Sequence, residues 1–203
     1  VGLPLAVEFG KEREVVGFDV SVARVSALIS GIDATQEVGP DELESSRFLK
    51  FSSDRADLES ASIFIVTVPT PVDETNRPDL GPLVTASELV GSVLSVGDIV
   101  IYESTVFPGC TEEVCVPVLE RASGLVFNKD FYCGYSPERI NPGDKVNTLR
   151  KIVKITSGSN DSVSSEIDDL YSSIIDAGTF KAKSIKIRCN CINKTFKNHE
   201  MPG

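Results

Sequence analysis

Short apolar runs rich in β-branched residues alternate along this chain with amphipathic stretches. The apolar runs predict strands at residues 14–19, 62–68, 98–103, 131–135 and 151–155. The first three are almost continuously hydrophobic, which is typical of strands buried on both faces of a parallel sheet. The last run alternates instead, which is typical of a strand with one polar face.

The stretches between these runs have helical periodicity. Helices are predicted at residues 20–29, 82–94, 111–121 and 161–175. Pro82 falls in a first turn, where its missing N–H costs nothing, and Thr111 is the expected N-cap of the helix that follows it. Alternating strands and helices predict an α/β doubly wound fold.

Length and charge narrow the class of protein. The 203 residues suffice for one large domain with at most a short appendage, and the net charge of −10 disfavours nucleic-acid binding. No apolar run approaches the roughly 20 residues that span a membrane, and the opening Val1-Gly2-Leu3-Pro4 has no basic leader. Together with an odd number of cysteines, five, these features predict reduced thiols and a cytoplasmic protein without a membrane partner.

A shift in composition near Ser184 predicts a boundary between a body at residues 1–183 and a basic, polar tail at residues 184–203. The tail holds Cys189, Cys191 and His199. Because they do not complete a four-ligand spacing, a chance cluster is favoured over a metal site.

Asp19 closes the first predicted strand. A carboxylate there suits a hydrogen bond to the ribose hydroxyls of a dinucleotide and repels a 2′-phosphate, which favours NAD over NADP. The alternative is a helix N-cap, a role that Asp also fills well. Gly2, which precedes a helical stretch, stands where the last glycine of a dinucleotide fingerprint would lie.

Hydroxyl-bearing loops follow the next two predicted strands. Thr70 lies in Val68-Pro69-Thr70-Pro71, and Thr105 lies in Glu103-Ser104-Thr105. Ligands of open α/β sheets bind beyond the carboxyl ends of strands, so both loops are candidate cofactor contacts. The alternative for the first loop is a turn stiffened by its two prolines.

A further loop, residues 135–143, gathers a carboxylate, a guanidinium and an amide between proline and glycine. Such a loop could orient a sugar and hold water near a carboxylate base. The alternative is a solvated turn with an ion pair.

Taken together, the motifs resemble one family. They are Val1-Gly2-Leu3-Pro4, Gly17-Phe18-Asp19, Val66-Thr67-Val68-Pro69-Thr70-Pro71, Tyr102-Glu103-Ser104-Thr105-Val106 and Tyr135-Ser136-Pro137-Glu138-Arg139-Ile140-Asn141-Pro142-Gly143. In this order and spacing they are similar to UDP-sugar 6-dehydrogenases of the UDP-glucose/GDP-mannose dehydrogenase family. The Ser136–Gly143 run resembles most the branch that acts on UDP-N-acetylglucosamine and UDP-N-acetylmannosamine, with UDP-glucose 6-dehydrogenase as the alternative.

The resemblance implies a Rossmann-type fold, NAD as cofactor, and oxidation of the C6 alcohol of a UDP-sugar to a carboxylate by two hydride transfers. By position it implies cofactor contacts from Gly2, Asp19, Arg24, Thr70 and Thr105. It implies Glu138 as the catalytic carboxylate, in a sugar-side loop with Arg139, Ile140, Asn141 and Pro142. It also implies a homo-oligomer.

The sequence departs from the family at both ends. The family's first strand and the first two glycines of its fingerprint are absent, so we expect a sheet truncated between the strands at residues 14–19 and 62–68. The family's central helix and nucleophilic cysteine are absent as well. We therefore expect a fragment that does not complete catalysis alone, with a non-catalytic nucleotide-binding or interaction module as the alternative.

Overall fold

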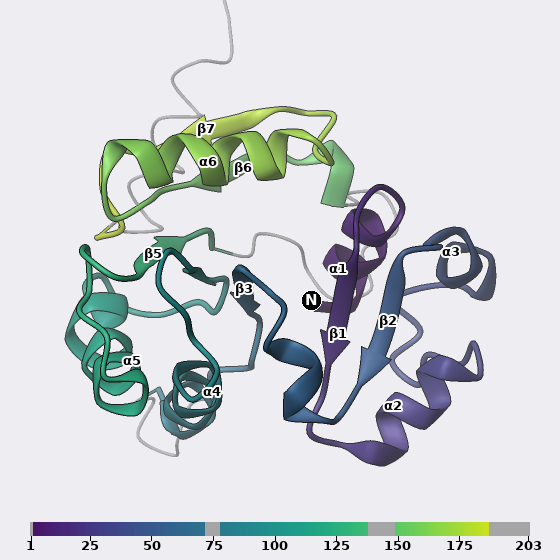
Figure 1. Cartoon of the computed structure of the whole chain (residues 1–203). Helices are drawn as coiled ribbons and strands as arrows, with labels where there is room; N and C mark the ends of the chain where they lie inside the picture. The colour runs from purple at the N-terminus through teal and green to yellow at the C-terminus, as the bar shows by residue number, and fades with distance from the viewer. Residues whose placement is uncertain (1, 72–77, 138–148, 187–203) are drawn as a thin grey trace, which may run out of the picture.

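A computed structural model describes residues 2–71, 78–137 and 149–186. Its strands form three parallel ladders (Figure 1). They are β1 (Val15–Phe18) with β2 (Leu49–Ser52), β3 (Ile63–Val66) with β4 (Ile99–Tyr102) and β5 (Tyr132–Tyr135), and β6 (Lys154–Thr156) with β7 (Thr179–Lys181). The first four predicted strands are therefore present, each shorter than its apolar run, whereas the strand predicted at residues 151–155 is shifted to Lys154–Thr156.

The helices are α1 (Gly2–Gly10), α2 (Val22–Ile29), α3 (Pro40–Ser45), α4 (Gly81–Gly91), α5 (Val116–Ser123) and α6 (Asp161–Ser172), with 3-10 turns at Arg55–Leu58 and Leu149–Lys151. Helices α2, α4, α5 and α6 end within three residues of predicted boundaries, whereas α3 was not predicted. Ser21 and Asn160 cap α2 and α6 through their side chains, and Pro82 lies in the first turn of α4 as predicted. In the part of the chain that the model describes, no helix is long and apolar enough to cross a bilayer.

The central strand β4 shows why the fold is doubly wound. Val100 and Tyr102 belong to one hydrophobic cluster, which α4 and α5 cover. Ile99 and Ile101 point the other way, into a second cluster with residues of α1 and α6. All four side chains are buried, because a strand with helices on both faces has no polar side. The predicted doubly wound fold is confirmed.

The sheet is interrupted between β1 and β3. Each of these strands is bonded to one neighbour, β2 or β4, and among the described residues no strand lies between them. In Figure 1 the start of the chain lies in this interval. The interruption is where the sequence predicts the absent first strand.

The helix after β4 differs from its prediction. Thr111 is not an N-cap: the backbone of Cys110 is already helical, and Thr111–Cys115 forms a π-helical turn that leads into α5. Val116 N–H donates to Thr111 C=O, five residues back. Pro117 has no N–H, so the next α-helical hydrogen bond cannot form and the wider turn is tolerated.

Candidate functional site

The predicted site residues that the model describes lie where parallel strands end. Asp19 follows β1, Thr70 lies in the loop after β3, and Thr105 lies in the loop after β4. Gly2 begins α1 beside the end of β3, so closely that a Cβ on Gly2 would come within 2.3 Å of Thr67 Oγ1. A side chain at residue 2 would therefore force either Thr67 or the start of α1 to shift, which favours glycine there.

Asp19 does not cap α2. Its Oδ1 accepts a hydrogen bond from Ser21 N–H at 2.8 Å, and Ser21 Oγ in turn accepts from Arg24 N–H at 3.3 Å. Ser21 therefore fills the capping role that was the alternative for Asp19. The Asp19 carboxylate stays 39% exposed, with Oδ2 3.9 Å from Arg24 Nε, and remains available to a ligand.

Arg24 lies between two carboxylates. Besides Asp19, it pairs with Asp33, whose Oδ1 accepts from Arg24 Nη2 at 3.1 Å. The Asp33 side chain is fully buried, whereas that of Arg24 is 26% exposed. Arg24 thus lies beside Asp19, as the resemblance implies, and its firmest partner is an acid that the sequence analysis did not single out.

The loops after β3 and β4 are fastened to each other. Ser104 Oγ donates to Val68 C=O at 2.5 Å, and Thr70 Oγ1 donates to Thr105 C=O at 3.0 Å. Glu103 N–H donates to Val66 C=O and so extends the β3–β4 ladder to the base of these loops. The two loops therefore form one wall at the end of the sheet, which explains why Thr70 and Thr105 lie together.

A buried polar network supports this wall from behind. The carboxylate of Glu103 pairs with Lys154 Nζ at 2.6 Å and accepts a short hydrogen bond from Tyr171 OH. Glu103, Lys154 and Tyr171 are at most 3% exposed. Sequence reasoning missed this network, since its members are far apart in the chain.

The remaining predicted site residues, Glu138–Pro142, lie outside the described residues, as do Cys189, Cys191 and His199. Ser136, which begins the same loop, is described. It follows β5, its N–H donates to Tyr102 C=O at 3.0 Å, and its buried Oγ has no hydrogen-bond partner. The loop therefore starts at the same edge of the sheet as the others. No metal-binding cluster of His, Cys, Asp or Glu occurs in the part of the chain that is described.

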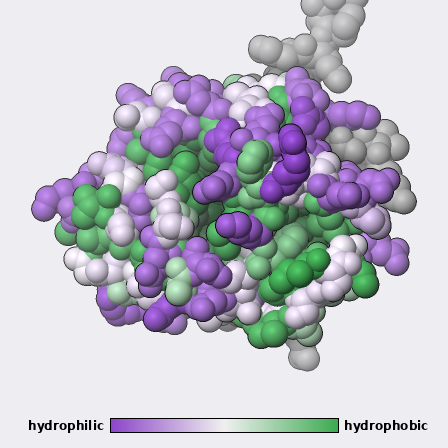
Figure 2. Space-filling view, turned by 45° about the vertical axis from the view of Figure 1, so that its right-hand side comes forward, coloured by the Kyte–Doolittle hydropathy of each residue, from purple (hydrophilic) through white to green (hydrophobic). Residues whose placement is uncertain are grey.

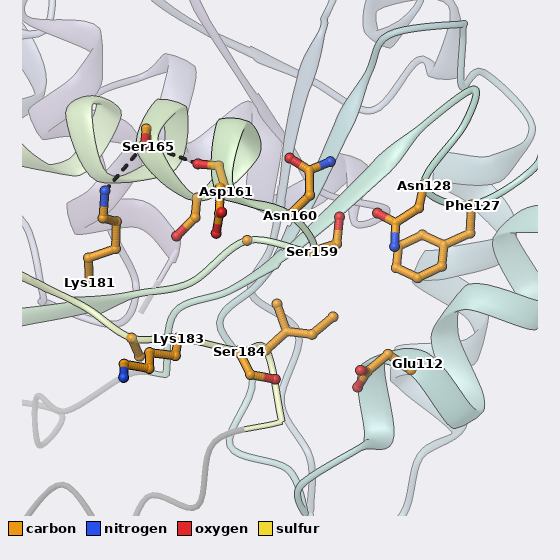
Figure 3. Close-up of a pocket in the computed structure, with 14 residues that line it drawn as sticks. Glu112, Phe127, Asn128, Ser159, Asn160, Asp161, Ser165, Lys181, Lys183 and Ser184 are labelled. Carbon is orange, nitrogen blue, oxygen red and sulfur yellow. Dashed lines mark hydrogen bonds between the residues drawn. The ribbon is translucent and has the colours of Figure 1, made fainter.

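A pocket of about 390 Å³ lies away from the predicted site residues (Figure 3). Its lining includes Glu112, Asn128, Asn160 and Lys181. The segment after β6 pairs antiparallel with β5 through the Gly134–Gly158 bridge, and Ser159 N–H donates to Cys133 C=O near the amino end of β5. The pocket is therefore at the opposite end of β5 from Ser136. Burial raises the pKa of the Glu112 carboxyl, and one of its oxygens has no partner.

The residues at the strand ends fit a dinucleotide. The exposed Asp19 carboxylate suits ribose hydroxyls, and the start of α1 presents backbone N–H groups that favour a diphosphate. Val20, next to Asp19, is 76% exposed. Val22 and Ile29 of α2 are exposed as well, so the surface around α2 is partly apolar. Figure 2, which brings this side forward, shows hydrophobic residues at the surface among hydrophilic ones. An exposed apolar residue beside a ribose-binding acid is compatible with contact to an adenine ring.

Comparisons with known proteins agree with this geometry. Residues 1–175 match the UDP-glucose/GDP-mannose dehydrogenase family, NAD binding domain. The chain is 58% identical to the UDP-N-acetyl-D-glucosamine 6-dehydrogenase of Salmonella typhi and 60% identical to that of Pseudomonas aeruginosa, over 92% of this chain and 44% of each relative. It therefore spans less than half the length of these relatives.

A solved structure gives the same result for the fold. The UDP-D-ManNAc dehydrogenase from Pyrococcus horikoshii superposes with a TM-score of 0.84 at 30% identity, over 98% of this chain and 48% of that one. The family match over most of the chain and the shared fold lead to one conclusion: the chain belongs to the UDP-glucose/GDP-mannose dehydrogenase family, with residues 1–175 matching its NAD-binding domain.

Proposed function

We propose that this chain is the cofactor-binding part of an enzyme that oxidises the C6 alcohol of a UDP-N-acetylhexosamine to a carboxylate, and that it does not complete this reaction alone. The observation that carries the proposal is the exposed Asp19 carboxylate at the end of β1, together with the Thr70–Thr105 hydrogen bond that joins the loops after β3 and β4. The sugar class is supported by the 58% and 60% identical relatives, which are named for UDP-N-acetyl-D-glucosamine.

In this proposal the described residues bind and orient the cofactor. Asp19 accepts hydrogen bonds from the adenosine ribose, Arg24 lies beside it, and the start of α1 at Gly2 faces the diphosphate. The loops that contain Thr70 and Thr105 form a wall, and this wall limits where the nicotinamide ring of the cofactor can lie. When bound here, NAD would supply the hydride acceptor for the C6 carbon, and oxidation of the alcohol to a carboxylate would require two NAD.

The sugar-side loop completes the proposal. Glu138 serves as the carboxylate base, and Arg139, Ile140, Asn141 and Pro142 contact the sugar. The described start of this loop at Ser136, at the same edge as Thr70 and Thr105, supports this assignment.

The covalent part of the oxidation requires a nucleophile, which we place outside this chain. Cys110, Cys115 and Cys133 are free thiols with 0–1% exposure. Such cysteines cannot reach a sugar aldehyde. Free thiols also support our placement of the protein in the cytoplasm, and its homo-oligomeric state stays a prediction.

Two measurements test the proposal. Calorimetric titration of the purified chain with NAD should show saturable binding, and no NADH should form with UDP-GlcNAc, UDP-ManNAc or UDP-glucose. Robust NADH formation by this chain would contradict the expectation that it cannot complete the reaction alone. Failure to bind NAD would contradict the cofactor-binding role.

A chimera tests the substrate class. Residues 2–183 replace the matching part of the Pseudomonas aeruginosa relative, which supplies the rest of the enzyme. We expect NADH formation with a UDP-N-acetylhexosamine, loss of turnover with Glu138→Gln, and little activity on UDP-glucose. A preference for UDP-glucose would overturn the assigned branch.

A further inference from the structure

The loop after α2 is organised around one buried carboxylate, that of Asp33. Its Oδ1 accepts from Thr35 Oγ1 at 2.7 Å and from Thr35 N–H at 3.0 Å. Its Oδ2 accepts from Thr35 Oγ1 at 2.9 Å and from the N–H groups of Glu37 and Val38 at 2.9 and 3.2 Å. The loop therefore wraps both oxygens of Asp33 in donors.

These donors keep Asp33 charged. Burial acts to raise its pKa, but the hydrogen bonds from Thr35, Val38 and Glu37 outweigh burial and lower the pKa to about 2. A carboxylate that is ionised and fully shielded from water needs a counter-charge. Arg24 supplies it at 3.1 Å.

The pairing determines what Arg24 can do for a ligand. Its Nη2 is bonded to Asp33, and its Nε is 3.9 Å from Asp19. The three groups together carry one net negative charge. An arginine near a ribose-binding acid can accommodate the 2′-phosphate of NADP, but only if its guanidinium is free to turn toward that phosphate. Here the guanidinium is held by the protein.

We propose that Asp33 is a specificity-determining residue. By holding Arg24 in a partly buried ion pair, it keeps the adenosine-ribose end of the site net negative and excludes dinucleotides that carry a 2′-phosphate. The inference rests on the proposed cofactor role and deepens it. It assigns the discrimination to a pair of acids, Asp19 at the surface and Asp33 beneath Arg24, rather than to Asp19 alone.

The test uses the full chain and ligands that report on this end of the site. Dissociation constants are measured for NAD and NADP, and for the smaller probes 5′-AMP and adenosine 2′,5′-bisphosphate. Asp33→Asn removes the charge and keeps an acceptor oxygen for the loop. Its preference for 5′-AMP over the bisphosphate should fall by about tenfold, because one negative charge near a doubly charged phosphate is gone and Arg24 is released.

Three further variants separate charge from structure. Asp33→Ser also removes the charge and is measured in parallel, so that the result does not depend on one variant folding. Thr35→Val removes the hydroxyl that donates to Asp33 but keeps the carboxylate, so the preference should stay as in the parent chain. Adding Arg24→Gln to Asp33→Asn should abolish the improved bisphosphate binding, since that gain comes from Arg24.

The outcomes distinguish this inference from the proposed function. If the parent chain binds 5′-AMP and NAD but neither Asp33 variant alters the preference, the role of Asp33 is refuted and the cofactor role stands. An improvement that survives Arg24→Gln also refutes it. If the parent chain binds none of the four ligands, the proposed cofactor role fails, and the inference fails with it.

Discussion

Lys154 Nζ lies 2.6 Å from Glu103 Oε2, and this buried ion pair joins β6 to the end of β4. The two residues are 51 positions apart: Lys154 lies on β6, and Glu103 directly follows β4, which belongs to a different ladder. Tyr171 of α6 donates to the same carboxylate and lies beneath the ammonium, with Lys154 Nζ 5.6 Å from its ring centroid. The pair therefore anchors the β6–α6 unit to the strand that leads into the Ser104–Thr105 loop.

Removing one partner of this pair should be costly. Lys154→Met leaves Glu103 buried without a counter-charge, and we expect a loss of about 3–5 kcal/mol in the free energy of unfolding. The double variant Lys154→Met with Glu103→Gln should lose less, because the residual group is neutral. Urea denaturation of the parent chain and both variants measures the difference, and equal losses would mean that charge is not what the pair contributes.

The network also shows what sequence patterns can and cannot reveal. The strands β3 and β4 were predictable because burial on both faces gives continuous apolar runs. Lys154 was not, because it lies in an alternating run whose polar positions are expected to face water, and its partner has no local signal. The strand β2 was missed for a related reason: Lys50 and Ser52 interrupt its pattern at the edge of the sheet.

The site was predictable in part for the same physical reason. Asp19, Thr70 and Thr105 each follow an apolar run, and the parallel pairing of β3 with β4 places Thr70 and Thr105 at one edge. Asp33 follows no strand, and its importance depends on Arg24, nine residues earlier. The only local signal is Asp33 followed two residues later by Thr35, a spacing suited to a side-chain turn.

The hydrogen bond from Ser104 to Val68 should matter for cofactor binding. Ser104→Ala removes the hydroxyl that fastens the β4 loop to the β3 loop, at a cost of about 1 kcal/mol in stability. Because one of the two side-chain hydrogen bonds between the loops is then lost, we expect the dissociation constant for NAD to rise by roughly threefold to tenfold. Calorimetry measures the constant. Ser45→Ala, on exposed α3, is the matched control and should leave NAD binding unchanged. An unchanged dissociation constant in Ser104→Ala would show that the hydrogen bond between the two loops does not contribute to NAD binding.

The buried cysteines should resist alkylation in the folded chain. Burial raises the pKa of Cys133 above its ordinary value, and the hydrogen bond with Cys110, together with burial, raises that of Cys115. Thiols in this state are poor nucleophiles. Iodoacetamide at neutral pH, followed by peptide mass mapping, should leave Cys115 and Cys133 unmodified in buffer and modify them in urea. The hydrogen bond with Cys115 lowers the pKa of Cys110, so only its complete burial should protect that thiol in buffer. Val96→Cys, at a site that is 72% exposed, provides a reactive control. Rapid native labelling of Cys115 or Cys133 would contradict their burial.

Asp33 should make stability depend on pH below about 4. Its pKa is about 2 in the folded chain, against 3.8 for an unperturbed carboxyl. The folded pKa is the lower one, so the contribution to stability is fully present above pH 4 and is lost as the pH falls toward 2. Its size is about 2 kcal/mol, because each pKa unit corresponds to roughly 1.4 kcal/mol.

Urea unfolding of the parent chain and of Asp33→Asn between pH 2 and 6 measures this contribution to stability. The variant should be less stable at pH 6, and the two curves should converge near pH 2. Glu44→Gln, which removes an exposed carboxylate, should keep the parent's dependence. A constant difference between the parent and Asp33→Asn across this range would show that the carboxylate is not selectively stabilised by the folded loop.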